Sequence, residues 1–197
     1  MIGAGDDDPV RTYSLEEQAQ LTEHLHAVTQ RVHAGELRDR PLNIEVLCAL
    51  HAALFSDVRD HAGRIRRSGF GSEYLTFGPN RSVHRDEVER SLNALFANVA
   101  LELQAIADKR EEEEYELVAL RLAARTHAEI IWVHPFEDGN GRTSRLCAGH
   151  LLVKCGLLPI PMEAAKQEYT AALNYYFRTR DLDPLVALFV RLYAVGR

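Results

Sequence analysis

The segment from 134 to 145 concentrates residues that could act on a phosphate ester. It reads HPFEDGNGRTSR, and its turn is made of residues that adopt positive φ at low cost: Gly139, Asn140 and Gly141. A turn of this composition that leads into a helix directs several main-chain N–H groups to one point, where the helix N-terminus adds positive potential. The segment therefore predicts a nest for an anion.

Charged side chains flank this turn. Arg142 and Arg145 are three residues apart, so they share one face of the first helical turn. Two guanidinium groups beside a nest favour a ligand with more than one phosphate. Because a bare polyphosphate would repel Asp138, we expect a divalent cation, Mg²⁺, to bridge this carboxylate and the phosphates.

His134 supplies a group that can accept a proton. Pro135 ends the preceding helix, so His134 lies where the chain turns. An imidazole titrates near neutrality and can therefore act as a general base. The residues by themselves predict a nucleotide or polyphosphate site with a proton-accepting histidine.

The same segment resembles the signature of the Fic family, H-x-F-x-[D/E]-G-N-G-R-x-x-R, and matches each fixed position. We call residues 134–145 the signature segment. The resemblance extends from about Leu42 to Tyr193. It implies a protein adenylyltransferase, which moves the AMP of ATP to a Ser, Thr or Tyr hydroxyl of a target protein and releases pyrophosphate.

The resemblance also implies a role for each signature residue. His134 would deprotonate the target hydroxyl, and Asp138 would hold Mg²⁺ against the α- and β-phosphates. Phe136 would anchor the segment in the core. The phosphates of ATP, the co-substrate, would be bound at Gly139, Asn140, Gly141, Arg142 and Arg145.

Helical periodicity surrounds the signature segment. Ser14 and Glu17 form a capping-box pattern at the start of a helix that should end at Ala34-Gly35. Further helices are predicted from Pro41 to Leu54, at about 85–109, from 111–114 to 132, from within 141–145 to 155, at about 161–179 and at 184–193. We therefore predict an all-α bundle, the Fic fold, as a single domain over 13–197 after a flexible tail at 1–12.

The stretch from 61 to 80 has no helical pattern. Two short strands, 66–70 and 73–77, are predicted around a Gly71-Ser72 turn. Fic proteins carry a β-hairpin flap at this place, here about residues 64–80, whose free edge could pair with an extended target segment. The expected docking positions are Arg66, Ser68, Phe70, Tyr74 and Thr76. The arginines around this hairpin favour either an acidic target or nucleotide phosphates.

Many Fic proteins are inhibited by the glutamate of a motif [S/T]-x-x-x-E-[G/N], which pairs with the second signature arginine, here Arg145. Thr12 is the only Ser or Thr with a glutamate four residues later, Glu16, and Glu17 stands where Gly or Asn would follow. Glu16 is thus a candidate for a degenerate inhibitory residue. The alternatives are constitutive activity or a small antitoxin-like partner that supplies the glutamate to this chain as the toxin.

Composition excludes several classes. The 197 residues carry 23 Lys and Arg against 29 Asp and Glu, a net charge of −6, which disfavours nucleic acid as a partner. No apolar run approaches the roughly 20 residues of a membrane span, and no secretory signal precedes the first helix. We expect a cytoplasmic protein, or an effector exported without such a signal. Other transfers (UMP or GMP, phosphate, phosphocholine) and an idle interaction module remain alternatives.

Overall fold

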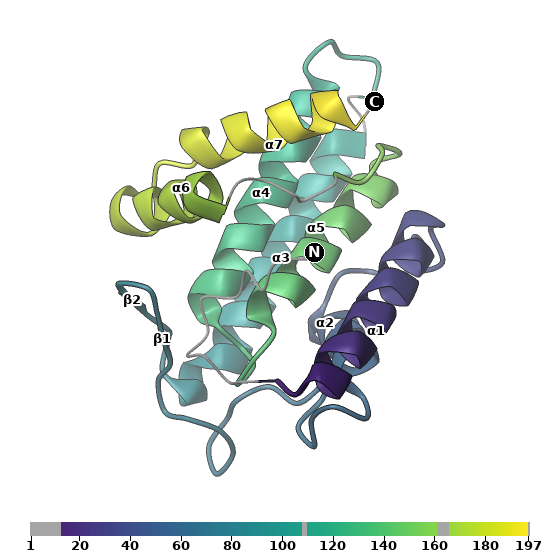
Figure 1. Cartoon of the computed structure of the whole chain (residues 1–197). Helices are drawn as coiled ribbons and strands as arrows, with labels where there is room; N and C mark the ends of the chain where they lie inside the picture. The colour runs from purple at the N-terminus through teal and green to yellow at the C-terminus, as the bar shows by residue number, and fades with distance from the viewer. Residues whose placement is uncertain (1–12, 108–109, 161–165, 197) are drawn as a thin grey trace.

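The computed structural model describes residues 13–107, 110–160 and 166–196 (Figure 1). The expected tail at 1–12 and the start of the helix predicted at 161 lie outside the described residues. The elements within these ranges are α1 (Leu15–His33), α2 (Ile44–Phe55), β1 (Thr76–Phe77), β2 (Asn80–Arg81), a 3₁₀ turn η1 (Arg85–Glu87), α3 (Val88–Ala107), α4 (Tyr115–Val133), α5 (Asn140–Lys154), α6 (Lys166–Thr179) and α7 (Asp183–Val195). The predicted helical bundle with one small β-hairpin is confirmed.

Helix ends follow local capping chemistry. At the start of α1 the Glu17 N–H donates to Ser14 Oγ at 3.1 Å, and the Ser14 N–H donates to Glu17 Oε2 at 2.7 Å, so the predicted capping box forms. Asn43 caps α2 by accepting from the Val46 N–H at 2.9 Å.

The predicted start of α4 was wrong by a few residues. This helix begins at Tyr115, whose hydroxyl donates to the Cys155 carbonyl at 2.6 Å, after the acidic run at 111–114.

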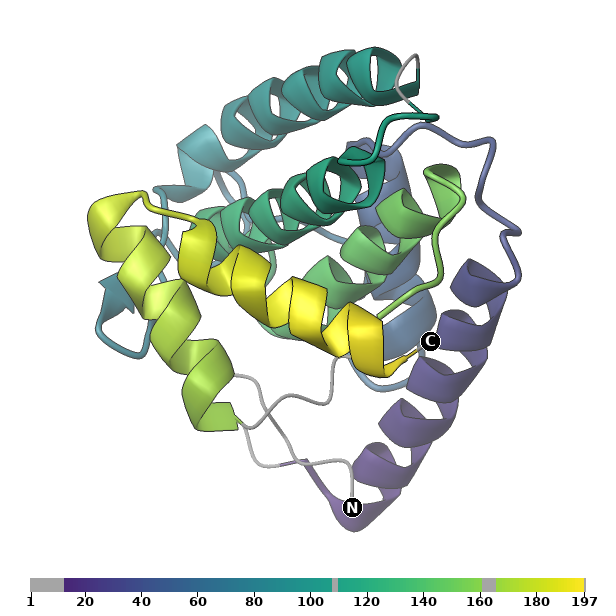
Figure 2. The same cartoon turned by 90° about the horizontal axis from the view of Figure 1, so that it is seen from above.

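Two helices, α4 and α5, form the centre of the bundle. They pack along each other, with α3 against α4, as Figures 1 and 2 show. The helices α1 and α2 contact α5 from one side, and α6 and α7 contact α4 from the other. The signature segment joins α4 to α5 and therefore lies at one end of this central pair. In the described part of the chain, no helix combines the length and apolarity required to cross a membrane.

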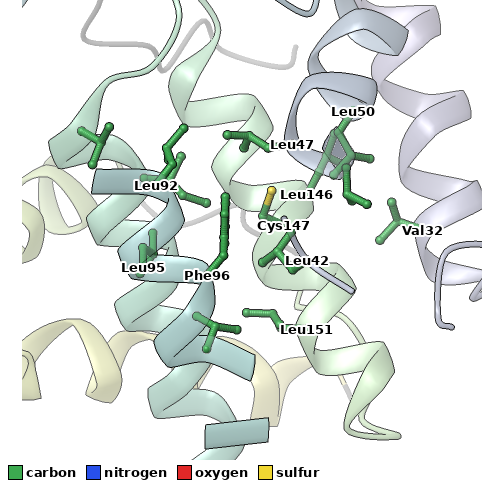
Figure 3. Packing of buried hydrophobic residues seen from close by; sticks show 14 of the residues in the cluster. Val32, Leu42, Leu47, Leu50, Leu92, Leu95, Phe96, Leu146, Cys147 and Leu151 are labelled. Carbon is green, nitrogen blue, oxygen red and sulfur yellow. The ribbon is translucent and has the colours of Figure 1, made fainter. Parts of the chain in front are cut away.

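Buried apolar side chains form two clusters that share the central pair. One lies among α1, α2, α3 and α5, and Figure 3 shows part of it: Val32, Leu42, Leu47, Leu50, Leu92, Leu95, Phe96, Leu146, Cys147 and Leu151. The other lies among α4, α5, α6 and α7 and includes Ile131, Leu152, Tyr176, Phe177 and Phe189. Phe136, from the signature segment, belongs to the first cluster. Core packing thus continues directly into the signature segment.

The β-hairpin does not lie where the sequence pattern placed it. The strands predicted at 66–70 and 73–77 do not form a ladder. Instead β1 pairs with β2 around Gly78-Pro79, with Thr76 opposite Arg81 and Phe77 opposite Asn80. Residues 66–73 bond to the signature segment: the Arg66 N–H donates to the Pro135 carbonyl at 2.7 Å, and Ser72 Oγ donates to Glu137 at 2.9 Å. These tertiary bonds replace the strand pairing.

Among the described residues, His51, His127 and His150 are buried between helices. Burial lowers the pKa of His51 and of His127 to about 3 each, and lowers the pKa of His150 to about 4. His150 Nε2 donates to the Arg40 carbonyl at 3.2 Å and so links α5 to the connection between α1 and α2. In the unfolded chain all three would titrate near 6.5. The folded state therefore holds neutral rings where the unfolded state takes up protons.

This difference predicts acid sensitivity. The free energy of unfolding should be constant above pH 6.5 and should fall below it, because the unfolded chain binds protons first. Each histidine contributes up to about 1.4 kcal/mol per pH unit until its folded-state pKa is approached. Urea unfolding followed by circular dichroism between pH 7.5 and 5 measures the slope. His150→Gln should make the slope shallower, and a flat profile in the wild-type protein would contradict the prediction.

Candidate active site

A stack of rings anchors the signature segment. The His51 ring lies 3.8 Å from the Phe136 ring and 4.6 Å from the Phe55 ring, centre to centre. His51 Nδ1 accepts the Gly63 N–H at 2.8 Å, so Nε2 carries the proton and donates to the Asp138 carbonyl at 3.0 Å. Phe136 is fully buried, which confirms its expected role as an anchor. His51 is a positioning residue that the sequence showed only as a polar residue on a buried helix face.

His134 lies at the C-terminal end of α4, where a hydrogen bond and a ring stack fix its side chain. It caps α4 in the left-handed region, at φ 53° and ψ 60°. Its Nδ1 lies 3.1 Å from the Ile131 carbonyl, which can only accept, so Nδ1 carries the proton. With the proton on Nδ1, the second ring nitrogen, Nε2, is the atom that could accept a proton. The ring stacks parallel to Phe77 of β1 at 4.5 Å, and the residue is 3% exposed.

Arg66 is not a docking residue, which corrects the sequence expectation. It is completely buried, and its guanidinium group donates to oxygens of two separate segments. Nε reaches the His134 carbonyl at 2.9 Å, and the Nη atoms reach Val133 O, Ser72 O, Glu73 O, Ser82 Oγ and Val83 O at 3.0–3.3 Å. Burial lowers the pKa of Arg66 to about 10, so it stays charged at neutral pH. Arg66 fastens the flap segment to the end of α4.

The other expected docking positions lie at the surface or close to it. Ser68, Tyr74 and Thr76 are exposed, and Phe70 is half-buried. Arginines cover the aromatic rings: Arg64 lies 3.9 Å from the centre of the Phe70 ring, and Arg81 lies 3.5 Å from the Tyr74 ring. Docking at these positions stays a prediction.

Asp138 is enclosed by positive charge. Its carboxylate is 4% exposed, and Oδ1 accepts the Gly139 N–H at 2.6 Å. Arg142 lies 3.6 Å from Oδ1, and Arg59 of the loop after α2 lies 4.0 Å from Oδ2. The Tyr13 hydroxyl donates to Oδ2 and accepts from Arg142 Nη2 at 3.1 Å. Burial and this carboxylate raise the pKa of Tyr13.

This carboxylate fits a cation shared with phosphates. Among the described residues, no three His, Cys, Asp or Glu side chains gather into a metal cluster. A cation at Asp138 would therefore take most of its ligands from phosphate oxygens and water, which is the coordination that Mg²⁺ prefers. The residues present are compatible with Mg²⁺ in the company of a nucleotide.

The turn itself differs from the prediction. Only Gly139 has a positive φ, 74°, while Asn140 and Gly141 already belong to α5. The Asn140 side chain does not face a ligand, because Oδ1 accepts the Phe136 N–H and Nδ2 donates to the Phe136 carbonyl, both at 2.9 Å. Asn140 thus braces the segment. The amides of residues 140–142 form the first turn of α5, where no intrahelical carbonyl can reach them, and this is where phosphates would be bound.

The two signature arginines lie in different surroundings. The Arg142 guanidinium carbon lies 4.7 Å from the Phe55 ring centre, on the side of Asp138 and Tyr13. Arg145 lies one turn further along α5, near His127, and its positive charge adds to the burial that lowers the pKa of that ring. His127 Nε2 is 2.8 Å from the Tyr169 hydroxyl of α6. Arg142 thus neighbours Asp138 and Tyr13, and Arg145 neighbours His127.

Glu16 lies exposed in the first turn of α1, and the Thr12 of its motif lies outside the described residues. The neighbouring Glu17 forms an ion pair with Arg59 at 2.6 Å. An inhibitory role of Glu16 therefore stays a prediction. Sequence reasoning missed Tyr13 and Arg59. No local pattern marks them, because Tyr13 is 125 residues away from the carboxylate that it contacts.

The close packing of Gly139 generates a prediction. A Cβ atom at this position would lie 2.2 Å from the Phe55 ring and would need a strained φ. We expect Gly139→Ala to lower the free energy of unfolding by at least about 3 kcal/mol, or to prevent folding. Gly69→Ala is the matched control, because Gly69 has a similar φ of 76° but nothing within 4 Å of its Cβ position. It should cost about 1 kcal/mol. Equal losses in urea unfolding would disprove the clash.

Comparisons with known proteins agree with this architecture. A sequence model of the Fic/DOC family matches residues 41–152. The relative named "Probable protein adenylyltransferase y4lH" from Sinorhizobium fredii is 28% identical over 91% of this chain and 88% of its own length. Several other curated relatives match in part, and the matched region is only 10–13% of their length.

Two solved structures show the same fold. Fic-1 from C. elegans superposes with a TM-score of 0.68 at 22% identity, covering 95% of this chain and 52% of that chain. The BepC effector protein from Bartonella tribocorum, solved with bound AMPPNP, superposes with a TM-score of 0.66 at 17% identity, covering 96% and 94%. Identity this low shows the fold alone. The family model, which matches more than half of the residues, shows the relationship itself: this chain belongs to the Fic/DOC family.

Proposed function

We propose that this protein is an adenylyltransferase that moves AMP from ATP to a hydroxyl of a target protein. The observation that carries the proposal is that one short segment holds both His134, whose Nδ1 donates to the Ile131 carbonyl, and the enclosed Asp138 carboxylate directly before the first turn of α5. Adenylyltransferase relatives and the AMPPNP-bound BepC structure support a nucleotide as the ligand.

The reaction needs little covalent chemistry from the protein. His134 Nε2 takes the proton of the target hydroxyl, whose oxygen forms a bond to the α-phosphorus of ATP. The bond from that phosphorus to the α–β bridging oxygen breaks, and pyrophosphate leaves with the electron pair. Mg²⁺, when bound at Asp138, would neutralise phosphate charge. Arg142, Arg145 and the α5 amides would stabilise the developing charge of the leaving group.

The flap segment presents the target. Phe77 of β1 stacks on the His134 ring, so a chain laid along this hairpin would pass close to the base. Exposed Thr76 and Tyr74 lie on the adjoining stretch. Main-chain pairing to such an edge sets the register of an extended target segment with little dependence on its sequence. A Ser, Thr or Tyr hydroxyl in that register would reach Nε2.

Labelled nucleotide distinguishes the candidate transfers. With Mg²⁺ and a cell lysate, the wild-type protein should label a protein from α-labelled ATP and not from γ-labelled ATP. His134→Ala should lower this labelling at least about 100-fold and leave the Kd of ATP within about twofold, because the general base is removed without loss of a phosphate contact. His26→Ala, an exposed histidine of α1, is the control. Label from the γ-phosphate alone, or normal transfer by His134→Ala, would refute the proposal.

Arg145 offers a separate test of the phosphate contacts. A guanidinium that binds the terminal phosphates makes charge-assisted hydrogen bonds that AMP cannot receive. We expect Arg145→Ala to weaken ATP about 10- to 100-fold and to change the Kd of AMP by less than about threefold. Isothermal titration calorimetry measures both. Equal weakening of ATP and AMP would place Arg145 elsewhere, and unchanged ATP affinity would remove it from the site.

A further inference from the structure

Tyr13, the residue before the N-cap Ser14 of α1, occupies the candidate cation site. The Tyr13 hydroxyl donates to Oδ2 of Asp138 and accepts from Nη2 of Arg142 at 3.1 Å. One oxygen thus touches both the carboxylate expected to hold Mg²⁺ and a guanidinium expected to bind phosphate. A phosphate oxygen bound next to a cation at this carboxylate would need the same place.

The structure holds Tyr13 in this position from several sides. The Arg59 guanidinium carbon lies 4.4 Å from the centre of the Tyr13 ring, and that of Arg142 lies 5.4 Å away. Arg59 also pairs with Glu17 at 2.6 Å, and Glu17 closes the capping box with Ser14. The first turn of α1 and the signature segment are thereby joined through one arginine. The contact is part of a built arrangement and not an isolated hydrogen bond.

Cation and tyrosine cannot share the carboxylate oxygen. Mg²⁺ binds a carboxylate oxygen at 2.0–2.1 Å and imposes near-octahedral geometry. The hydroxyl proton of Tyr13 points at the same oxygen, so it would be forced toward the cation. Arg142 faces an analogous choice, because it cannot hold Tyr13 and a phosphate in the same geometry. Asp138 and Asn140 are 3% and 1% exposed, so the site is closed in this arrangement.

We propose that Tyr13 is an internal competitor of the cation and nucleotide, and that the start of α1 must leave Asp138 before both can bind. The proposal rests on the proposed function, because it takes the Asp138 site to be the one that Mg²⁺ and ATP enter. The inhibitory contact is then made to the cation ligand and to Arg142. It does not use Glu16, whose side chain is exposed at the next turn.

Thermodynamic linkage predicts whether removal of the Tyr13 hydroxyl strengthens or weakens nucleotide binding. A ligand that needs the open state binds more weakly in proportion to the population of the closed state. The hydrogen bonds of Tyr13 involve two charged partners, each worth about tenfold or more in an equilibrium constant. Removing the hydroxyl should therefore tighten the nucleotide complex. A tyrosine that merely positioned Asp138 and Arg142 for the ligand would give the opposite result.

The test measures binding without turnover. Tyr13→Phe keeps the ring between the two guanidinium groups and removes only the hydroxyl. In isothermal titration calorimetry with Mg²⁺ and an ATP analogue with a methylene α–β bridge, we expect Tyr13→Phe to bind at least about tenfold more tightly than wild type. Tyr115→Phe is the matched control, because it removes a buried hydroxyl bond of 2.6 Å at the opposite end of α4. It should leave the Kd within about twofold.

Three results would overturn the competitor: unchanged or weaker binding by Tyr13→Phe, equal tightening by Tyr115→Phe, or equal tightening by Glu16→Gln. Asp138→Asn separates this failure from failure of the proposed function. If Asp138→Asn abolishes the Mg²⁺ dependence of binding while Tyr13→Phe does not change the Kd, the cation site at Asp138 is supported and competition by Tyr13 is refuted. If Tyr13→Phe tightens binding but no AMP is transferred to any protein, competition by Tyr13 is supported and the proposed AMP transfer is refuted.

Hydrogen exchange offers an independent readout in the wild-type protein. Release of Tyr13 frees the first turn of α1, where the Glu17 N–H donates to Ser14 Oγ. We therefore expect Mg²⁺ and the analogue together to speed amide exchange in residues 15–20. Slower or unchanged exchange there, at saturating analogue, would contradict displacement of this turn.

Discussion

A buried guanidinium group is the interaction on which the site depends. Arg66 brings one positive charge to the carbonyl groups that end α4, where the helix leaves its last acceptors without intrahelical donors. The same group satisfies the carbonyls of Ser72 and Val83. The acceptors at the end of α4 are buried and those of Ser72 and Val83 are partly buried, so loss of this donor would leave several of them unsatisfied at once. The left-handed turn at His134 and the path of the flap segment therefore depend on the same guanidinium group.

The signature segment is rigid for a related reason. Its polar groups are used internally before any ligand arrives: Asn140 bonds both main-chain groups of Phe136, and His51 holds the Asp138 carbonyl. In the proposed reaction, a site fixed in this way would hold the imidazole and the carboxylate in place without reorganisation, which is how electrostatic stabilisation is most effective. This arrangement requires close packing, because a Cβ atom at Gly139 would overlap the Phe55 ring.

The charge balance around Asp138 connects the proposed AMP transfer with its proposed control by Tyr13. Arg59 and Arg142 approach the carboxylate together with a phenol that donates a proton to it. A phosphate chain with its cation would bring its own charges into the same space. In the proposed exchange, the charge of Asp138 would be balanced by Tyr13 and two arginines in the closed arrangement and by the cation in the loaded one, and the start of α1 would move between them.

Some features could be predicted because their signals are local. The capping box at Ser14 and Glu17, the end of α4 before Pro135 and the burial of Phe136 each follow from a few adjacent residues. The prediction of strands at 66–70 and 73–77 was wrong because the deciding contacts are not local. Alternating residues and glycines around 66–77 favoured strands, but Arg66 and Ser72 formed bonds to the signature segment, more than 60 residues away.

The sequence by itself determined the helical class and which short segment carries a base, a carboxylate and two guanidinium groups, because spacing along a helix and turn chemistry act over a few residues. Only the tertiary structure decided that Arg66 is internal, that Asn140 braces the turn and that Tyr13 sits on Asp138. A buried polar group takes whichever partner the fold brings within hydrogen-bond distance, and that partner has no fixed separation in the chain.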